Sequence, residues 1–295
     1  MELGKRRLLA PALSSMASAD ALRRRLESLR FRGKWADVKG VAEDNDAIMA
    51  GGGFDLASDG DMMRVSVPAL PAAESFQLSS AALAPSEARF ARTVVCVANI
   101  DTLTAALALG DACALSHANA SVPGGRYRHG GRAQEEDLCR CLPQLWPSLN
   151  ASLELYPLPP NGALVTRNLV AVRRPGTYER CEPIGQCTIV TAAMPCGVAD
   201  RRPKGGWLAS PWAEDVSERI RTVLHAAKST KHANLVLGAW GCGAFGNPTA
   251  PVAALFKKHL ASEEFRGAFE HVVFAILDPL GTGNLGPFKQ EFGGK

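Results

Sequence analysis

The chain has 295 residues, of which 46% are hydrophobic, so it can bury a sizeable core within one large domain. Its formal net charge of +4 comes from charges of both signs spread along the chain, a bias too weak to indicate direct binding to duplex nucleic acid. No apolar run approaches about 18 residues, so we expect no membrane span.

The eight cysteines predict a reducing compartment. They form no CxxC pair and no His/Cys spacing of the zinc type, and several lie in apolar, strand-like runs. We therefore expect reduced thiols, no structural metal and an intracellular location, in the cytoplasm or nucleus. Residues 1–18 carry Lys5, Arg6 and Arg7 beside small apolar residues, which is typical of a disordered tail or of a weak organelle-targeting segment.

The first part of the chain gives few structural signals. Leucines at helical spacing predict a short amphipathic helix over residues 22–29, ending near Gly33. The glycine run at 51–54 is followed by acidic residues that would repel phosphate, so we expect a turn there. Residues 62–70 are typical of a strand, and a Ser/Ala-rich connection follows to Pro85.

From residue 93 onward, short apolar runs alternate with helical patterns. Continuous apolar runs are typical of strands that are covered on both faces. Strands are predicted at 93–99, 112–116, 169–172, 188–192, 235–237 and 272–277. Helices are predicted at 102–109, 133–142, 216–228 and 252–260. This alternation indicates a layered α/β domain over residues 93–295, with residues 1–92 as an N-terminal extension.

Two glycine-rich loops follow predicted strands. The first, after His117, contains Pro123-Gly124-Gly125 and leads into a helix that opens on Gln134-Glu135-Glu136. Acidic residues at a helix start also complement the helix dipole, so charge capping is the alternative interpretation. The second, residues 238–247, places four glycines before a helix and so exposes backbone amides to an anion. Together the loops indicate a bound diphosphate, although neither has the spacing of Walker A or of a dinucleotide fingerprint.

These blocks resemble the microbial-type poly(ADP-ribose) glycohydrolases, macrodomain proteins marked by a triple glycine followed by Gln-Glu-Glu. The similarity covers most of residues 93–278, in family order: 99–101, Asn119, 123–125, 133–140, 191–195, 237–247 and 273–278. The resemblance implies a macrodomain-like three-layer α/β/α sandwich with a mixed, mostly parallel central sheet. Arg126 stands where the family has its third glycine, which affects the expected form of the substrate.

The resemblance also implies the roles of individual residues. Glu136 would be the catalytic acid and base, and Glu135 its neighbour. Asp101 would accept from the adenine amino group, and Asn119 would hold the distal ribose. The diphosphate would be cradled by Gly124, Gly125, Gly241, Cys242, Gly243, Ala244, Phe245 and Gly246, with Phe245 also against a ribose. Arg126 could crowd the diphosphate or hold it as a bidentate donor. From the residues alone, Asp101 could equally cap a helix, Asn119 could be a turn residue and Phe245 could belong to the core.

The expected chemistry is cleavage of a ribosyl C1–O bond, which passes through an oxocarbenium-like transition state. A partly desolvated carboxyl can protonate the departing oxygen and then activate water, without a cofactor. The substrates implied are poly(ADP-ribose) or ADP-ribosylated proteins. One alternative is an ADP-ribose-binding module without turnover. A weaker alternative is hydrolysis by the Cys242 thiol.

Overall fold

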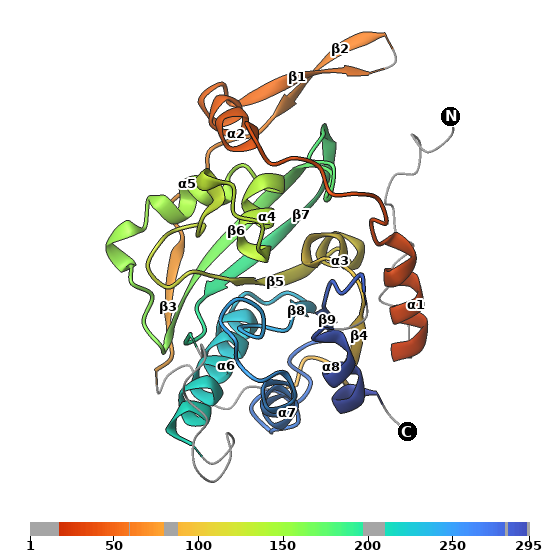
Figure 1. Ribbon diagram of the computed structural model, residues 1–295, viewed down its shortest axis with the longest axis vertical. Helices are drawn as coiled ribbons and strands as arrows, with labels where there is room; N and C mark the ends of the chain where they lie inside the picture. The colour runs from red at the N-terminus through yellow and green to blue at the C-terminus, as the bar shows by residue number, and fades with distance from the viewer. Residues whose placement is uncertain (1–17, 59, 80–87, 197–209, 281–282, 294–295) are drawn as a thin grey trace.

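The computed structural model describes residues 18–58, 60–79, 88–196, 210–280 and 283–293 (Figure 1). Its helices are α1 (Ala19–Leu29), α2 (Val41–Ala50), α3 (Thr102–Leu109), α4 (Gln134–Cys141), α5 (Leu145–Asn150), α6 (Pro211–Ser229), α7 (Thr249–Leu260) and α8 (Leu285–Phe292). Its strands are β1 (Gly53–Ser58), β2 (Asp61–Ser66), β3 (Glu74–Gln77), β4 (Val94–Ala98), β5 (Ala112–His117), β6 (Gly162–Arg173), β7 (Arg180–Ala192), β8 (Asn234–Leu237) and β9 (His271–Ala275). Short 3-10 turns occur at Tyr127–His129 and Leu153–Leu155. The tail predicted at residues 1–18 lies outside the described residues except for Ser18, whose side chain caps α1.

Seven strands form the central sheet, in the order β3-β6-β7-β5-β8-β9-β4. Strands β7, β5, β8, β9 and β4 are parallel neighbours, whereas β6 is antiparallel to both β7 and β3. The sheet is therefore mixed and mostly parallel, as predicted. Because the five parallel strands end at the same edge, the loops that follow them converge there.

Helices cover both faces of the sheet. Along each strand, alternate residues face opposite sides; Cys113 and Leu115 of β5 face one core, and Ala112 and Ala114 face the other. Helices α1, α3, α4 and α5 pack on the face of Ala114, while α6, α7 and α8 pack on the face of Leu115. This arrangement confirms the three-layer sandwich.

The predicted strands and helices after residue 93 all occur, with small shifts at their ends. The strand predicted at 169–172 is the middle of the 12-residue β6, which forms a long hairpin with β7. The strand predicted at 62–70 ends at Ser66, two residues before Pro68, which has no amide to donate to a sheet. Gly51 and Gly52 form the expected turn, which connects α2 to β1, while Gly53 and Phe54 already belong to β1. Helices α2, α5 and α8 and strands β1 and β3 were not predicted.

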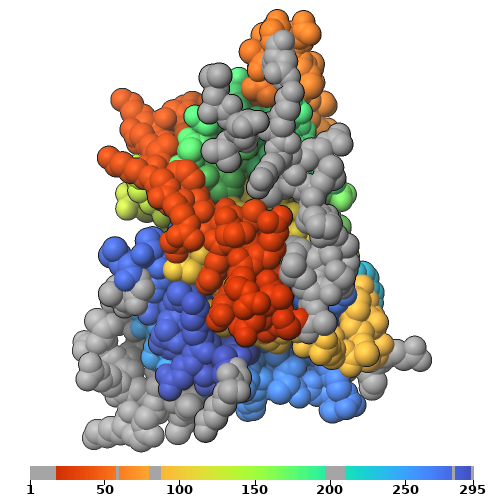
Figure 2. Space-filling model, turned by 90° about the vertical axis from the view of Figure 1, so that its right-hand side faces the viewer, coloured from red at the N-terminus to blue at the C-terminus, as the bar shows by residue number. Residues whose placement is uncertain are grey.

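The N-terminal part of the chain is interwoven with the rest. Helix α1 packs on β4, and its Glu27 lies 3.5 Å from Lys289 of α8. Seen from the side, α1 lies against the dark-blue C-terminal helix (Figure 2). Strand β3 joins the sheet beside β6, and the β1–β2 hairpin projects from the molecule (Figure 1). The predicted division at residue 92 stays a prediction.

The eight cysteines are all free thiols, and six of them are buried. In the described part of the chain, no helix has the length and apolarity needed to cross a membrane. Within the same residues, no group of three or more His, Cys, Asp or Glu side chains could hold a metal ion.

Candidate active site

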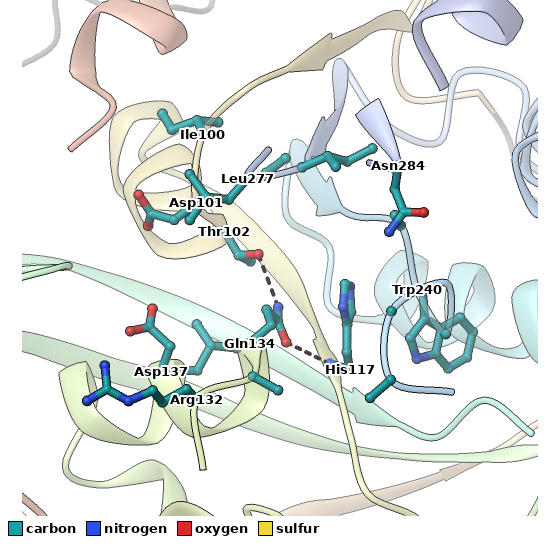
Figure 3. A pocket seen from close by; sticks show the side chains of 18 of the residues that line it. Ile100, Asp101, Thr102, His117, Arg132, Gln134, Asp137, Trp240, Leu277 and Asn284 are labelled. Atoms are coloured by element: carbon teal, nitrogen blue, oxygen red, sulfur yellow. Dashed lines mark hydrogen bonds between the residues drawn. The ribbon is translucent and has the colours of Figure 1, made fainter. Parts of the chain in front are cut away.

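A pocket of about 580 Å³ opens at the carboxyl edge of the parallel strands. Its walls come from the segments that follow β4, β5, β8 and β9, together with α4 (Figure 3). This volume lies in the range typical of small-molecule sites. Five of the predicted site residues line it: Asp101, Gly241, Gly243, Ala244 and Phe245.

Asp101 lies at one end of the pocket, directly after β4. Its Oδ1 accepts a hydrogen bond of 2.8 Å from the Thr104 amide, so it caps α3, as one of the two interpretations predicted. Its Oδ2 is buried without a partner among the described residues, and burial raises the pKa of this carboxyl. The capping bond fixes the carboxyl, and the second oxygen is left for a donor on a ligand.

The glycine loop after β8 lies at the other end of the pocket. The buried side chain of Asn247 closes it by donating to the carbonyls of Gly241, at 3.1 Å, and Pro195, at 2.9 Å. A Cβ on Gly241 would lie 2.8 Å from Met194, so only glycine fits. In the described part of the chain, the amides of Gly243, Ala244 and Phe245 donate no hydrogen bond. Three successive unpaired amides form a site suited to an anion.

Helix α4 is anchored to the sheet by Gln134. Its Oε1 accepts from the His117 amide at 2.8 Å, and its Nε2 donates to the Leu115 carbonyl at 2.8 Å and the Thr102 hydroxyl at 3.1 Å (Figure 3). One side chain therefore fixes the start of α4 against β5 and α3. Gln134 also lines the pocket, which links the pocket to the acidic residues that follow.

Glu135 and Glu136 meet beneath Gly125. Glu136 Oε1 accepts from the Arg126 amide at 2.9 Å, and Glu135 Oε2 accepts from the Asn119 amide at 2.7 Å. A Cβ on Gly125 would lie 2.7 Å from Glu136 Oε1 and 2.9 Å from Glu135 Oε2. The loop can therefore lie this close to the two carboxyls only because residue 125 has no side chain. Consecutive helical side chains diverge by about 100°, yet both carboxyls hydrogen-bond to amides of the same loop.

The remaining oxygens of this acidic pair have no protein partner. Glu135 Oε1 and Glu136 Oε2 are both buried and unpaired within the described residues. Burial, with the nearby charge of Glu136, raises the pKa of Glu135 to about 8. The Glu135 carboxyl therefore retains a proton at neutral pH.

The first loop uses some predicted residues in an unexpected way. Asn119 Oδ1 accepts from the amides of Ser121, at 2.9 Å, and Val122, at 3.1 Å, so Asn119 is a turn residue. Only its Nδ2 is left to bind a ribose, a role that stays a prediction. Arg126 adopts φ −97°, a conformation open to any residue, and its exposed guanidinium has no partner in the described chain. The family's third glycine is therefore not required here by backbone geometry.

The predicted residues thus fall into two groups. Those absent from the pocket wall are Asn119, Gly124, Gly125, Arg126, Glu135, Glu136, Cys242 and Gly246. Helix α4 joins the groups, because Gln134 and Asp137 line the pocket and the two glutamates lie between them in sequence. Trp35, Asp137 and Tyr178 are among the lining residues that sequence reasoning did not name; of these three, only Asp137, which directly follows the two glutamates, gave a local signal.

Comparisons with known proteins show the family to which the chain belongs. A family model for the catalytic domain of microbial-type PARG, or poly(ADP-ribose) glycohydrolase, matches residues 47–165. PARG from Thermomonospora curvata is 26% identical with a TM-score of 0.74, covering 86% of this chain and 99% of its own. PARG from Deinococcus radiodurans, in complex with ADP-ribose, is 34% identical with a TM-score of 0.61, covering 72% and 88%. This chain belongs to the microbial-type PARG family.

Membership in the PARG family makes the chain a glycosidase-type hydrolase. A second T. curvata PARG structure, bound to the inhibitor ADP-HPD, is 27% identical with a TM-score of 0.66 and covers 86% of this chain and 99% of its own. No curated protein matches the chain.

A thiol mechanism finds little support in this PARG. Burial raises the pKa of Cys242 to about 12, so it stays protonated at neutral pH. Its Sγ donates to the Trp240 carbonyl at 3.6 Å. Phe245 is half-buried and packs against the core while also lining the pocket, and its predicted contact with a ribose stays a prediction.

Proposed function

We propose that this chain binds an ADP-ribose unit in the pocket and hydrolyses its ribosyl C1–O bond, in poly(ADP-ribose) or in ADP-ribosylated protein. The observation that carries the proposal is the pair of buried, unpaired oxygens, Glu135 Oε1 and Glu136 Oε2, on the helix that also lines the pocket. Buried carboxyl oxygens without partners are costly, so they indicate a polar ligand that satisfies them.

The roles follow from charge. The diphosphate binds the unpaired amides of Gly243, Ala244 and Phe245, and the adenine binds near Asp101. Glu136 gives a proton to the departing oxygen and then takes one from the attacking water. Glu135 binds a ribose hydroxyl through Oε1 and holds the first loop through the Asn119 amide. The hydrogen bonds that Glu135 and Glu136 accept from the amides of the first loop would persist in the complex.

The decisive test compares the native chain with Glu136→Gln. The amide oxygen of glutamine still accepts from the Arg126 amide, but glutamine cannot transfer a proton. We expect turnover of poly(ADP-ribose) to fall by at least about a thousandfold, while calorimetric affinity for ADP-ribose changes by less than about threefold. Glu154→Gln, at an exposed glutamate, serves as the matched control and keeps full activity.

Each outcome has a distinct meaning. Undiminished hydrolysis by Glu136→Gln would remove Glu136 from the mechanism. If the native chain binds poly(ADP-ribose) but releases no ADP-ribose, the binding-module alternative holds. Repeating the assay on mono-ADP-ribosylated protein identifies which linkage is cut.

A further inference from the structure

The end of the pocket around Asp101 holds a second carboxyl, that of Asp137. Figure 3 shows Asp101 and Asp137 on the same side of the pocket, opposite Trp240 and Asn284. Burial, together with the charge of Asp101, raises the pKa of Asp137 to about 7, so the two carboxyls interact. Asp137 plays no part in the proposed bond cleavage.

Asp137 is held in a fixed orientation by Tyr178. The Tyr178 hydroxyl donates to Asp137 Oδ1 at 2.7 Å, which leaves Oδ2 as the free acceptor. Tyr178 itself adopts φ +57°, a left-handed conformation that costs a non-glycine residue on the order of 1 kcal/mol. Such local strain is typical of positions where a side chain must be aimed at a ligand.

The two ends of the pocket differ in electrostatic character. The glycine loop presents unpaired amides, which attract phosphate, whereas the carboxyl oxygens of Asp101 and Asp137 offer phosphate no amide donor. A nucleotide therefore binds with its diphosphate at the loop and its base at the carboxyls. Trp35 lines the same end, with its ring centroid 6.1 Å from that of Tyr178, and supplies an apolar wall for a flat base.

We propose that Asp137 is a specificity-determining residue that, together with Asp101, accepts the two hydrogens of the adenine 6-amino group. The inference rests on the proposed function and deepens it. A base with a carbonyl at the same position, such as hypoxanthine, offers no hydrogen there and would set its oxygen against two carboxyl groups. The site thus selects adenine for two reasons: hypoxanthine would leave the carboxyl acceptors unpaired, and its carbonyl oxygen would be repelled by their oxygens.

Calorimetric titration of the full chain with ADP-ribose and with its hypoxanthine counterpart tests this. We expect the native chain to prefer ADP-ribose by at least about tenfold, because a buried acceptor left unpaired is costly. Asp137→Ala should reduce this preference at least about threefold. Asp137→Asn should strengthen binding of the hypoxanthine nucleotide, because the amide can donate to its carbonyl, and a gain of affinity cannot come from misfolding. Asp61→Ala, at an exposed aspartate on β2, is the control.

The outcomes separate this inference from the proposed function. If Asp137→Ala and Asp137→Asn leave the ratio of the two affinities unchanged, Asp137 does not read the base, even though ADP-ribose still binds. If the native chain binds neither nucleotide, the proposed function fails and this inference fails with it.

Discussion

The main-chain amide of Arg126 donates a hydrogen bond of 2.9 Å to Oε1 of Glu136, so the unusual residue of the first loop contacts the acid directly. The contact uses only backbone atoms, and the guanidinium of Arg126 is exposed. The side chain is therefore free to influence the substrate without altering the acid.

Arg126→Gly should change the choice of substrate more than the affinity for free ADP-ribose. We expect the ratio of rates on poly(ADP-ribose) and on mono-ADP-ribosylated protein to shift by at least about fivefold, because one phosphate contact of a guanidinium is gained or lost. Parallel rate measurements on the two substrates check this, with Arg126→Lys as the charge-retaining control. Equal loss on every substrate would show that the arginine is merely structural.

Gly125→Ala should inactivate the enzyme. The added methyl would lie 2.7 Å from Glu136 Oε1 at a backbone φ of +58°. Gly130→Ala is a matched control, since Gly130 has a similar φ of +75° but its nearest neighbour would be Val38 at 3.9 Å. Both variants should lose on the order of 1 kcal/mol of stability from backbone strain. Only Gly125→Ala should lower kcat, by at least about tenfold; similar activities in the two variants would contradict the predicted contact.

Asn45 should prove essential for both stability and activity. This buried side chain accepts from Arg173 Nε at 2.7 Å and donates to the Tyr127 hydroxyl at 2.9 Å and to the Arg140 carbonyl, at the end of α4, at 3.0 Å. Asn45→Ala leaves these groups unpaired, so we expect a loss of about 3 kcal/mol in the free energy of unfolding. Urea denaturation measures the loss, and Asn150→Ala, at an exposed asparagine, should change stability little. A stability equal to that of the native chain would refute the role.

The raised pKa of Glu135 predicts how stability depends on pH. In the folded chain Glu135 binds a proton up to about pH 8, whereas in the unfolded chain it releases the proton near its ordinary pKa of 4.5. Its contribution is thus complete below pH 4.5 and is lost as pH rises to about 8. Glu135→Gln removes a slope of up to about 1.4 kcal/mol per pH unit. Between pH 5 and 8, the free energy of unfolding from denaturation curves should therefore fall more steeply with pH for the native chain than for Glu135→Gln. Identical slopes for the two proteins would mean that Glu135 is ionised in the folded chain.

Local patterns were sufficient to locate the main loops. Asp101 follows a buried strand and precedes a helix, and the glycines of residues 241–246 lie between β8 and α7, so their meeting at one sheet edge followed from topology. The convergence of Glu135 and Glu136 on Gly125 did not follow, because helical geometry alone separates neighbouring side chains. It depends on how the loop folds over α4.

Contacts between distant parts of the chain were beyond sequence reasoning. Asn45 lies in a helix that was not predicted, and its partners Tyr127 and Arg173 are 82 and 128 residues away. Trp35 and Tyr178 likewise come from segments with no motif of their own, and only the folded chain brings them to the pocket. The residues that support the site therefore cannot be recognised from their neighbours in the sequence.

The pairing of β3 with β6 has a consequence for any shortened version of this protein. Without β3, the long β6 would present a row of unpaired backbone amides and carbonyls to solvent. An open edge of this kind recruits strands from other molecules, so a fragment starting at residue 93 would tend to self-associate before its catalytic competence could be judged.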